Sequence, residues 1–228
     1  MVHSVHPAGS TIQQREPDTM RPELIYIGDP MCSWCFGFAP VIQALYAKHR
    51  DAVTMTLRMG GLHVGNDYVV AADYREFLRA HWLEIGERTG QKFSLDILDR
   101  PAWIYDTELA CRAVVAVRRL KPGAEWAYFP LIQAGFYTHN RDPHDPLSFA
   151  LAAEEIGISR SDFLAAYDDP AVKAGTLEDF QWARSMGVHG FPTVLVQDAR
   201  GYALLTNGYQ PLEALEGPLE GWIASSGQ

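Results

Sequence analysis

Strand-like sequence occurs near the two ends of this chain and is absent from its middle. Residues 24–27 and 53–59 are short runs of β-forming or alternating side chains. Two further strand patterns lie at 193–196 and 202–205, and the polar residues between them predict a hairpin turn. Residues 60–192 carry no clear strand pattern. The simplest fold is therefore a small α/β domain into which a large helical subdomain is inserted.

The region between the strands has helical spacing. From about Val69 to Leu83, apolar side chains recur every three or four positions, with charged residues between them. Turn-forming Pro, Gly and Asp residues separate the later helical patterns. The later predicted helices cover residues 108–120, 126–137, 146–156, 162–167, 171–186 and 212–223.

The domain assignment follows from these patterns. The chain has 228 residues, of which 47% are hydrophobic, and it is long enough for one enlarged domain or two small ones. We assign residues 1–22 to a flexible N-terminal extension, 23–62 and 176–226 to the α/β domain, and 63–175 to the inserted subdomain.

Charge and hydropathy exclude several classes of partner. The net charge of −9 and the lack of a basic run argue against nucleic acid or an anionic membrane as the main partner. Residues 1–20 are polar and lack the apolar segment of a secretory signal. No stretch approaches the roughly 18 consecutive apolar residues of a membrane span. We therefore expect a cytoplasmic protein.

Two cysteines in a CxxC motif follow the first predicted strand and begin a helix. Gly28, Asp29 and Pro30 end the strand, and Cys32 and Cys35 lie in the first turn of the helix that follows. The unpaired backbone N–H groups and the positive dipole end of a helix N-terminus favour the thiolate of Cys32. The position predicts Cys32 as the nucleophile and Cys35 as the resolving thiol.

A metal site is the other use of CxxC spacing. Structural zinc takes four ligands, and the chain has no second CxxC. Cys111 lies in a helical pattern, where a cysteine usually packs as a small, partly buried apolar residue. We predict no metal site, so that any zinc on Cys32 and Cys35 would be adventitious or shared between subunits.

A proline begins the third predicted strand, within the sequence Gly190-Phe191-Pro192-Thr193. Because proline cannot donate to a β-ladder, it marks a strand start, a bulge or a cis peptide bond. For an isolated proline, an ordinary trans bond is the simplest interpretation. The CxxC motif at the end of the first strand changes this interpretation.

Together these motifs resemble the thioredoxin fold. The shared pattern is a strand, a CxxC, a helix that contains Pro40, and a late Gly-Phe-Pro-Thr before a hairpin and a terminal helix. Residues 29–38 and the helical insertion are similar to the DsbA family, in particular its signal-less bacterial branch, called FrnE-like. The resemblance covers about residues 23–222 and implies an α/β, thioredoxin-like fold with a large inserted α-helical subdomain.

The resemblance also implies roles for individual residues. Pro192 would be cis and face the disulfide, the backbone of Phe191 would pair with an extended substrate, and Pro40 would kink the helix. No cofactor is implied beyond the Cys32–Cys35 disulfide, with glutathione considered as a reductant. The residues expected to contact substrate are Met31, Ser33, Trp34 and Phe191. Of the neighbouring apolar residues, we assign Met31 and Trp34 to an exposed rim, and Phe36 and Phe38 to packing.

Two positions depart from the family pattern. Relatives carry a buried carboxylate six residues before the first cysteine, where this chain has Tyr26. We consider Asp29 and His189 as proton shuttles instead; the alternative interpretations are a turn-forming Asp and a surface His. Strongly oxidising periplasmic members have a histidine at the position of Trp34. Since a less stabilised thiolate makes a weaker oxidant, we expect a milder reagent here.

The leading functional hypothesis is a cytosolic thiol–disulfide oxidoreductase that acts on protein thiols or small disulfides through a mixed disulfide. An alternative is a glutathione-dependent isomerase or transferase, because the kappa glutathione transferases and hydroxychromene-carboxylate isomerases resemble this layout. Those relatives generally lack an intact CxxC. The direction of exchange and a homodimer stay open.

Overall fold

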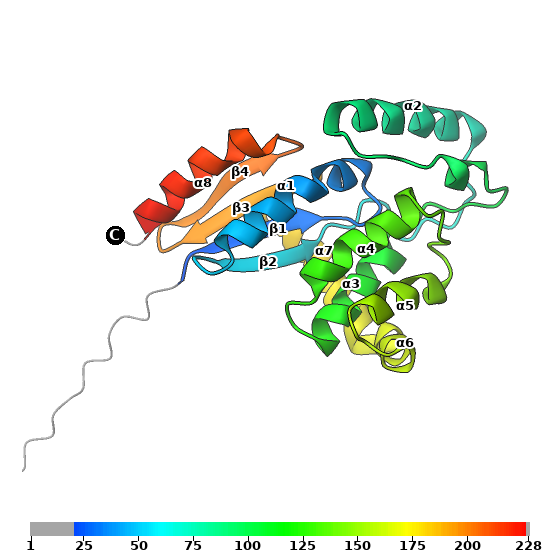
Figure 1. Cartoon of the computed structure of the whole chain (residues 1–228). Helices are drawn as coiled ribbons and strands as arrows, with labels where there is room; N and C mark the ends of the chain where they lie inside the picture. Colours follow the sequence, from blue (N-terminus) through cyan, green and yellow to red (C-terminus); the bar gives the residue numbers. More distant parts are fainter. Residues whose placement is uncertain (1–20, 227–228) are drawn as a thin grey trace, which may run out of the picture.

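A four-stranded sheet forms the centre of the α/β domain in the computed structural model, which describes residues 21–226 (Figure 1). Its strands lie in the order β2-β1-β3-β4, with β1 parallel to β2 and the other pairs antiparallel. The N-terminal extension expected over 1–22 lies outside the described residues except for Arg21 and Pro22. The strands are β1 (Glu23–Gly28), β2 (Thr54–Met59), β3 (Thr193–Asp198) and β4 (Gly201–Asn207).

The alternation of side chains along β1 divides the core between the two faces of the sheet. Leu24 and Tyr26 belong to the main core, which includes residues of α1 (Ser33–His49) and α8 (Leu212–Ser226). On the other face, Ile25 and Ile27 pack in a second cluster that contains Ala183, Val188 and Leu195. Ala183 comes from α7 (Pro170–Ser185), which therefore covers this face.

The inserted helices share the main core with the sheet. Figure 1 shows α3 to α6 as a bundle near β2, and α2 as a separate helix over the beginning of α1. Asp145 and Asp169 accept N-cap hydrogen bonds at α5 and α7, and a proline follows each of them as the first helical residue. The elements of the insertion are α2 (Ala72–Thr89), η1 (Asp96–Asp99), α3 (Glu108–Leu120), α4 (Glu125–Tyr137), α5 (Pro146–Glu155) and α6 (Arg160–Asp168).

Most predicted elements are present, and the first inserted helix shows the largest shift. It was expected over 69–83 but begins at Ala72, because Val69 forms an isolated β-bridge with Ile104. It continues to Thr89 and ends at Gly90, whose φ of 77° suits the left-handed C-cap that glycine favours. The expected domain boundary at residue 176 falls inside α7, which packs against both β2 and α3.

A buried carboxylate joins the insertion to the sheet. Asp179 of α7 accepts hydrogen bonds from Arg58 of β2 at 2.7 Å and from Arg118 of α3 at 2.8 Å. The backbone N–H of Met59 donates to the same carboxylate at 3.1 Å. Three elements are thereby held around one charge.

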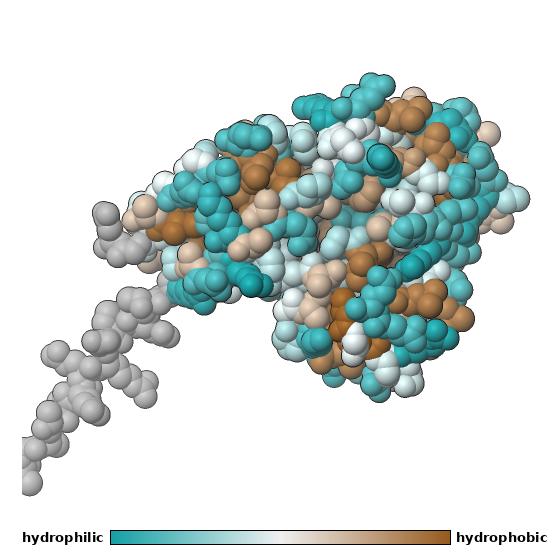
Figure 2. Space-filling model, viewed as in Figure 1, coloured by the Kyte–Doolittle hydropathy of each residue, from teal (hydrophilic) through white to brown (hydrophobic). Residues whose placement is uncertain are grey.

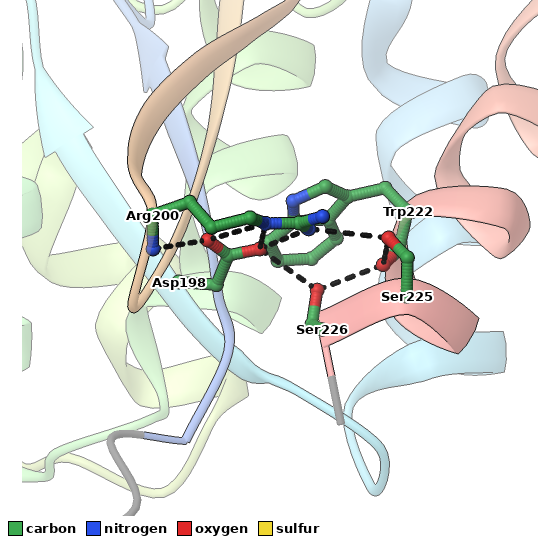
Figure 3. A network of polar contacts seen from close by, with 5 residues as sticks. All are labelled: Asp198, Arg200, Trp222, Ser225 and Ser226. Atoms are coloured by element: carbon green, nitrogen blue, oxygen red, sulfur yellow. Dashed lines mark hydrogen bonds and ion pairs between the residues drawn. The ribbon is translucent and has the colours of Figure 1, made fainter. Parts of the chain in front are cut away.

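A second polar network fixes the end of α8 on the β3–β4 hairpin (Figure 3). Asp198 accepts hydrogen bonds from the side chain and backbone of Arg200 and from the hydroxyl of Ser226. The guanidinium of Arg200 also donates to Ser225 at 3.1 Å. The Arg200 side chain holds the pKa of Asp198 well below its usual range.

The surface view shows apolar groups over α2 (Figure 2). Tyr74, Phe77 and Leu83 of this helix are among the exposed large hydrophobic residues. Within residues 21–226, no helix has the length and apolar character needed to cross a membrane.

Candidate active site

The two cysteines of the CxxC motif differ in their access to solvent. Cys32 is the N-cap residue of α1, and its backbone N–H donates to the carbonyl oxygen of Asp29 at 3.1 Å. The side chain of Cys32 keeps 5% of its surface exposed, whereas Cys35 is fully buried. Both thiols are free in the structure. An incoming sulfur atom can therefore reach Cys32 first.

The thiol of Cys35 is held in its protonated form. Burial raises the pKa of Cys35 well above its usual range, and a hydrogen bond with Cys32 raises it further. The backbone of Asp29 and the hydroxyl of Tyr26 oppose this shift and lower the pKa of Cys35. The raising effects are the larger ones, so Cys35 remains a protonated thiol at neutral pH.

The loop before β3 lies against Cys32. The Phe191–Pro192 peptide bond is cis, and the Cys32 thiol donates to the carbonyl oxygen of Phe191 at 3.6 Å. The hydroxyl of Thr193 donates to the carbonyl oxygen of Gly190 at 2.8 Å and steadies the loop. Two motifs 159 residues apart in the sequence thus form one site.

The ring of Phe191 rests on Gly60, a residue that no sequence motif connects to the site. A Cβ atom at Gly60 would lie 2.2 Å from the Phe191 ring, far inside van der Waals contact. The backbone N–H of Gly60 donates to the carbonyl oxygen of Gly28, which places it at the end of β1. In the sequence, Gly60 directly follows the strand predicted over 53–59, but its contact with Phe191 depends on tertiary structure.

Asp29 is a fully buried carboxylate that joins three segments. Burial raises the pKa of Asp29, while its hydrogen-bond donors offset part of that shift. The donors come from the loop before α1, from the chain after β2 and from the beginning of α3. They are Met31 N (2.8 Å), Leu62 N (2.7 Å), Thr107 Oγ1 (2.7 Å) and Cys111 Sγ (3.4 Å).

The two predicted proton shuttles lie in different surroundings. The carboxylate of Asp29 contacts the thiol of Cys111, and Asp29 reaches the active-site cysteines through its backbone. His189 is exposed in the loop before Phe191 and forms no hydrogen bond or ion pair with residues 21–226. Cys111 was expected to be partly buried, but it is fully buried and its thiol donates a hydrogen bond to the carboxylate of Asp29.

Tyr26 occupies the position where a carboxylate was expected from the family pattern. Its side chain is buried, and apart from the Cys35 thiol its hydroxyl has no partner within residues 21–226. Burial and the neighbouring Cys35 raise the pKa of Tyr26 well above its usual range. A neutral hydroxyl therefore takes the place of a charge beside Cys35.

The expectation that Met31 contributes an exposed rim side chain is wrong. The side chain is fully buried, and the hydroxyls of Tyr105 and Tyr137 both donate to the Met31 carbonyl oxygen. Met31 precedes α1 and packs in the core shared with the inserted helices, so its side chain does not contribute to the exposed rim. Ser33 is also buried, with 8% of its surface exposed.

Trp34 lies at the surface of the site and is partly exposed. Its ring contacts His81 and Tyr209, with centroids 5.9 Å apart in each pair, and the guanidinium of Arg88 lies 5.3 Å from its centroid. Phe36 and Phe38 are buried, as expected for packing residues. A shallow pocket of about 140 Å³ is lined by Trp34, Arg88, Phe191, Gly208 and Tyr209.

The fold and the site together define a class of protein. A CxxC at the beginning of a helix, set against a cis-proline loop on a β2-β1-β3-β4 sheet, is the arrangement of a thioredoxin-fold protein with a dithiol site. Within residues 21–226, no cluster of three or more His, Cys, Asp or Glu side chains is arranged to hold a metal.

Comparison with known proteins identifies the family. The model of the DSBA-like thioredoxin domain matches residues 25–220. The chain therefore belongs to the DSBA-like thioredoxin domain family, a family of thiol–disulfide oxidoreductases.

Solved structures agree with this assignment. A candidate protein disulfide isomerase from Nitrosomonas europaea is 34% identical with a TM-score of 0.81, over 90% of this chain and 98% of its own. The cytosolic disulfide reductase DsbM from Pseudomonas aeruginosa is 23% identical with a TM-score of 0.66, over 89% and 96% of the two chains. A structure of DsbM with GSH has a TM-score of 0.65 and 24% identity, over 89% and 96%. No curated protein matches the chain.

Proposed function

We propose that this protein is a cytosolic thiol–disulfide oxidoreductase in which Cys32 forms a mixed disulfide and Cys35 resolves it. The observation that carries the proposal is the contrast between the two thiols. Cys32 keeps 5% of its surface exposed at the beginning of α1 and donates a hydrogen bond to the carbonyl oxygen of Phe191, whereas Cys35 is fully buried with a raised pKa. This contrast separates the attacking sulfur from the resolving sulfur.

The exchange proceeds in two balanced steps. The Cys32 thiolate attacks one sulfur of a substrate disulfide, so that a Cys32–substrate disulfide forms and the other substrate sulfur leaves as a thiolate. Cys35 then loses its proton and attacks the Cys32 sulfur, which releases the second substrate thiol. The substrate gains two electrons, and the protein is left with a Cys32–Cys35 disulfide. Two thiols such as glutathione reverse these steps and restore the dithiol.

The surroundings of the cysteines suit a reductase better than a strong oxidant. Trp34, between the cysteines, offers no cationic hydrogen-bond donor to the Cys32 thiolate. A reducing cytosol keeps a dithiol of ordinary potential reduced. The fold shared with the cytosolic reductase DsbM and the identity to the Nitrosomonas protein support reductase or isomerase work.

Substrate contacts are assigned to the rim that remains accessible. The ring of Trp34 and the main chain of Phe191 are proposed to receive an extended polypeptide or a small disulfide beside Cys32 and Pro192. For the proton of Cys35, the backbone of Asp29 and the hydroxyl of Tyr26 are the groups that lower its pKa and favour its loss. His189 has no comparable contact.

Trapping the mixed disulfide tests the proposal. The Cys35→Ser variant, expressed in cells, should accumulate adducts on Cys32 that mass spectrometry identifies and that dithiothreitol releases. Cys32→Ser should lose insulin reduction, whereas the matched variant Cys111→Ser should retain it. Full insulin reduction by Cys32→Ser would show that the assigned nucleophile is wrong.

A double variant separates this function from the transferase alternative. A glutathione-dependent isomerase or transferase activates the thiol of bound glutathione and needs neither enzyme cysteine. We expect Cys32→Ser/Cys35→Ser to have no activity towards disulfides or conjugation substrates. Glutathione conjugation or isomerisation that persists in the double variant would favour the alternative.

A further inference from the structure

An arginine without an acidic partner lies beside the candidate active site. Arg88 is exposed in the last turn of α2 and forms no hydrogen bond or ion pair with its side chain within residues 21–226. Some arginines of this chain differ: Arg58 and Arg118 both bind the carboxylate of Asp179. The free charge is notable in a chain with a net charge of −9.

Two aromatic rings hold the guanidinium of Arg88. Its central carbon lies 5.3 Å from the ring centroid of Trp34 and 5.9 Å from that of Tyr209. Contacts of this kind position an arginine without neutralising its charge, and its N–H donors stay available to an anion. The side chain is thus prepared for a ligand that the protein itself does not supply.

The pocket lined by Arg88 shares Phe191 with the surroundings of the reactive sulfur. Its volume is about 140 Å³, and Phe191 forms part of its wall together with Trp34 and Tyr209. The carbonyl oxygen of Phe191 accepts a hydrogen bond from Cys32. A molecule attached to Cys32 would therefore begin at this wall and extend towards the guanidinium. The small volume suits one end of a short molecule.

We propose that this pocket binds a carboxylate of glutathione while the glutathione sulfur is joined to Cys32. The inference rests on the proposed disulfide exchange. Glutathione carries a sulfur atom and two carboxylates, and a guanidinium can bind a carboxylate through two parallel hydrogen bonds. In the reaction, the Cys32 thiolate attacks glutathione disulfide, one glutathione leaves as a thiolate, and the other stays on Cys32 with its carboxylate at Arg88. Cys35 then displaces it.

The test compares a charged disulfide with a neutral one. Formation of the mixed disulfide is measured by rapid mixing and mass spectrometry in a Cys35→Ser background, with glutathione disulfide and with bis(2-hydroxyethyl) disulfide, which has no carboxylate. The quantity compared is the rate with glutathione disulfide divided by the rate with the neutral disulfide. In Arg88→Gln this ratio should fall about tenfold, equivalent to about 1.4 kcal/mol. Arg88→Lys, which keeps the charge but loses the two-pronged geometry, should give an intermediate ratio.

Arg184→Gln is the matched control, because Arg184 is also exposed in the last turn of a helix, α7. Its ratio should equal that of the parent protein. An unchanged ratio in Arg88→Gln, with reactivity intact, would overturn the pocket and leave the exchange function standing. If Arg88→Gln slowed the reduction of insulin but not the reaction with glutathione disulfide, the proposed pocket would also be overturned. A parent protein that reacts with neither disulfide would overturn the function and the pocket together.

Discussion

The thiol of Cys32 donates a hydrogen bond to the carbonyl oxygen of Phe191, with 3.6 Å between the sulfur and the oxygen. The ring of the same residue packs closely on Gly60, which directly follows β2. The sheet and the loop before β3 therefore set the surroundings of the reactive sulfur together.

Adding a methyl group at Gly60 should disturb the active site through Phe191. The Gly60→Ala variant places a Cβ 2.2 Å from the ring, so the ring must move and shift the loop that faces Cys32. We expect insulin reduction to fall about tenfold and stability to fall by about 1–3 kcal/mol, the usual cost of overpacking. Activity and urea denaturation measure the two effects.

Gly175→Ala is the control for this substitution. Gly175 lies inside α7, where the nearest atom to an added Cβ is 3.7 Å away. Alanine has a higher helix propensity than glycine, so the Gly175→Ala control should be slightly more stable than the parent protein and fully active. Equal activity of Gly60→Ala and the parent protein would show that the Phe191 ring does not position the loop.

The hydroxyl of Tyr26 should assist the resolving step. It lowers the pKa of Cys35, so Tyr26→Phe should raise that pKa further and reduce the fraction of Cys35 thiolate at neutral pH. Release of glutathione from the Cys32 mixed disulfide should slow by a few-fold at pH 7, because less of the Cys35 thiolate is present. The pH profile of this step should move to higher pH. Single-turnover measurements between pH 6 and 10 give the profile.

The same substitution should not weaken the fold. The Tyr26 hydroxyl is buried and acts on no group other than the Cys35 thiol in the part of the chain that the structure describes, so its removal should change the free energy of unfolding little. Tyr128→Phe is the control, because that buried hydroxyl donates to the carbonyl oxygen of Phe149 at 2.9 Å, away from the cysteines. It should lose stability and keep the parent pH profile. A Tyr26→Phe protein with an unchanged profile would exclude a role for this hydroxyl.

The sequence was sufficient for most of the fold because the core alternates regularly. Leu24, Ile25, Tyr26 and Ile27 fill both faces of β1, which makes the strand recognisable without its partners. The insertion was recognisable because turn-forming residues separate its helices. The beginning of α2 was misplaced because the residues before it form a β-bridge to a distant segment, which no local pattern reveals.

The site was only partly predictable for a similar physical reason. Cys32 and Pro192 lie in motifs with their own local geometry, and the structure places them together. Met31 was misassigned because an apolar residue next to a cysteine can face either way, and only its packing in the core shared with the inserted helices decides which. Arg88 and Gly60 reach the site from elements whose packing cannot be read from spacing.

Removal of the charge on Asp179 should weaken the junction between the insertion and the sheet. Asp179 is buried, and its two arginine partners are partly exposed, so the loss is smaller than for a fully buried pair. We expect Asp179→Asn to lower the free energy of unfolding by about 2–3 kcal/mol. Urea denaturation measures this change.

An exposed ion pair provides the comparison. Glu154 binds Arg160 at 3.0 Å with both side chains largely exposed. Glu154→Gln should therefore change stability by less than about 1 kcal/mol. Equal effects of Asp179→Asn and Glu154→Gln would mean that the buried network does not hold the two parts together.

The buried thiol of Cys111 should make the protein less stable at alkaline pH. Burial raises the pKa of Cys111 well above its usual range, and Asp29 raises it further. An unfolded cysteine loses its proton at about pH 8.5, whereas the folded protein keeps it. Between these two pKa values the folded state binds one more proton, so the free energy of unfolding falls as pH rises, by up to about 1.4 kcal/mol per pH unit. This contribution to stability is fully present below about pH 8.

Cys111→Ser isolates this effect in the reduced protein. Serine does not ionise in this range, and its hydroxyl can still donate to Asp29. The variant should be less stable at neutral pH, because a more polar group is buried, but its stability should fall less steeply between pH 8 and 10. Urea denaturation at several pH values, with a reductant present, compares the two slopes. Identical slopes would show that the folded and unfolded states bind the Cys111 proton equally.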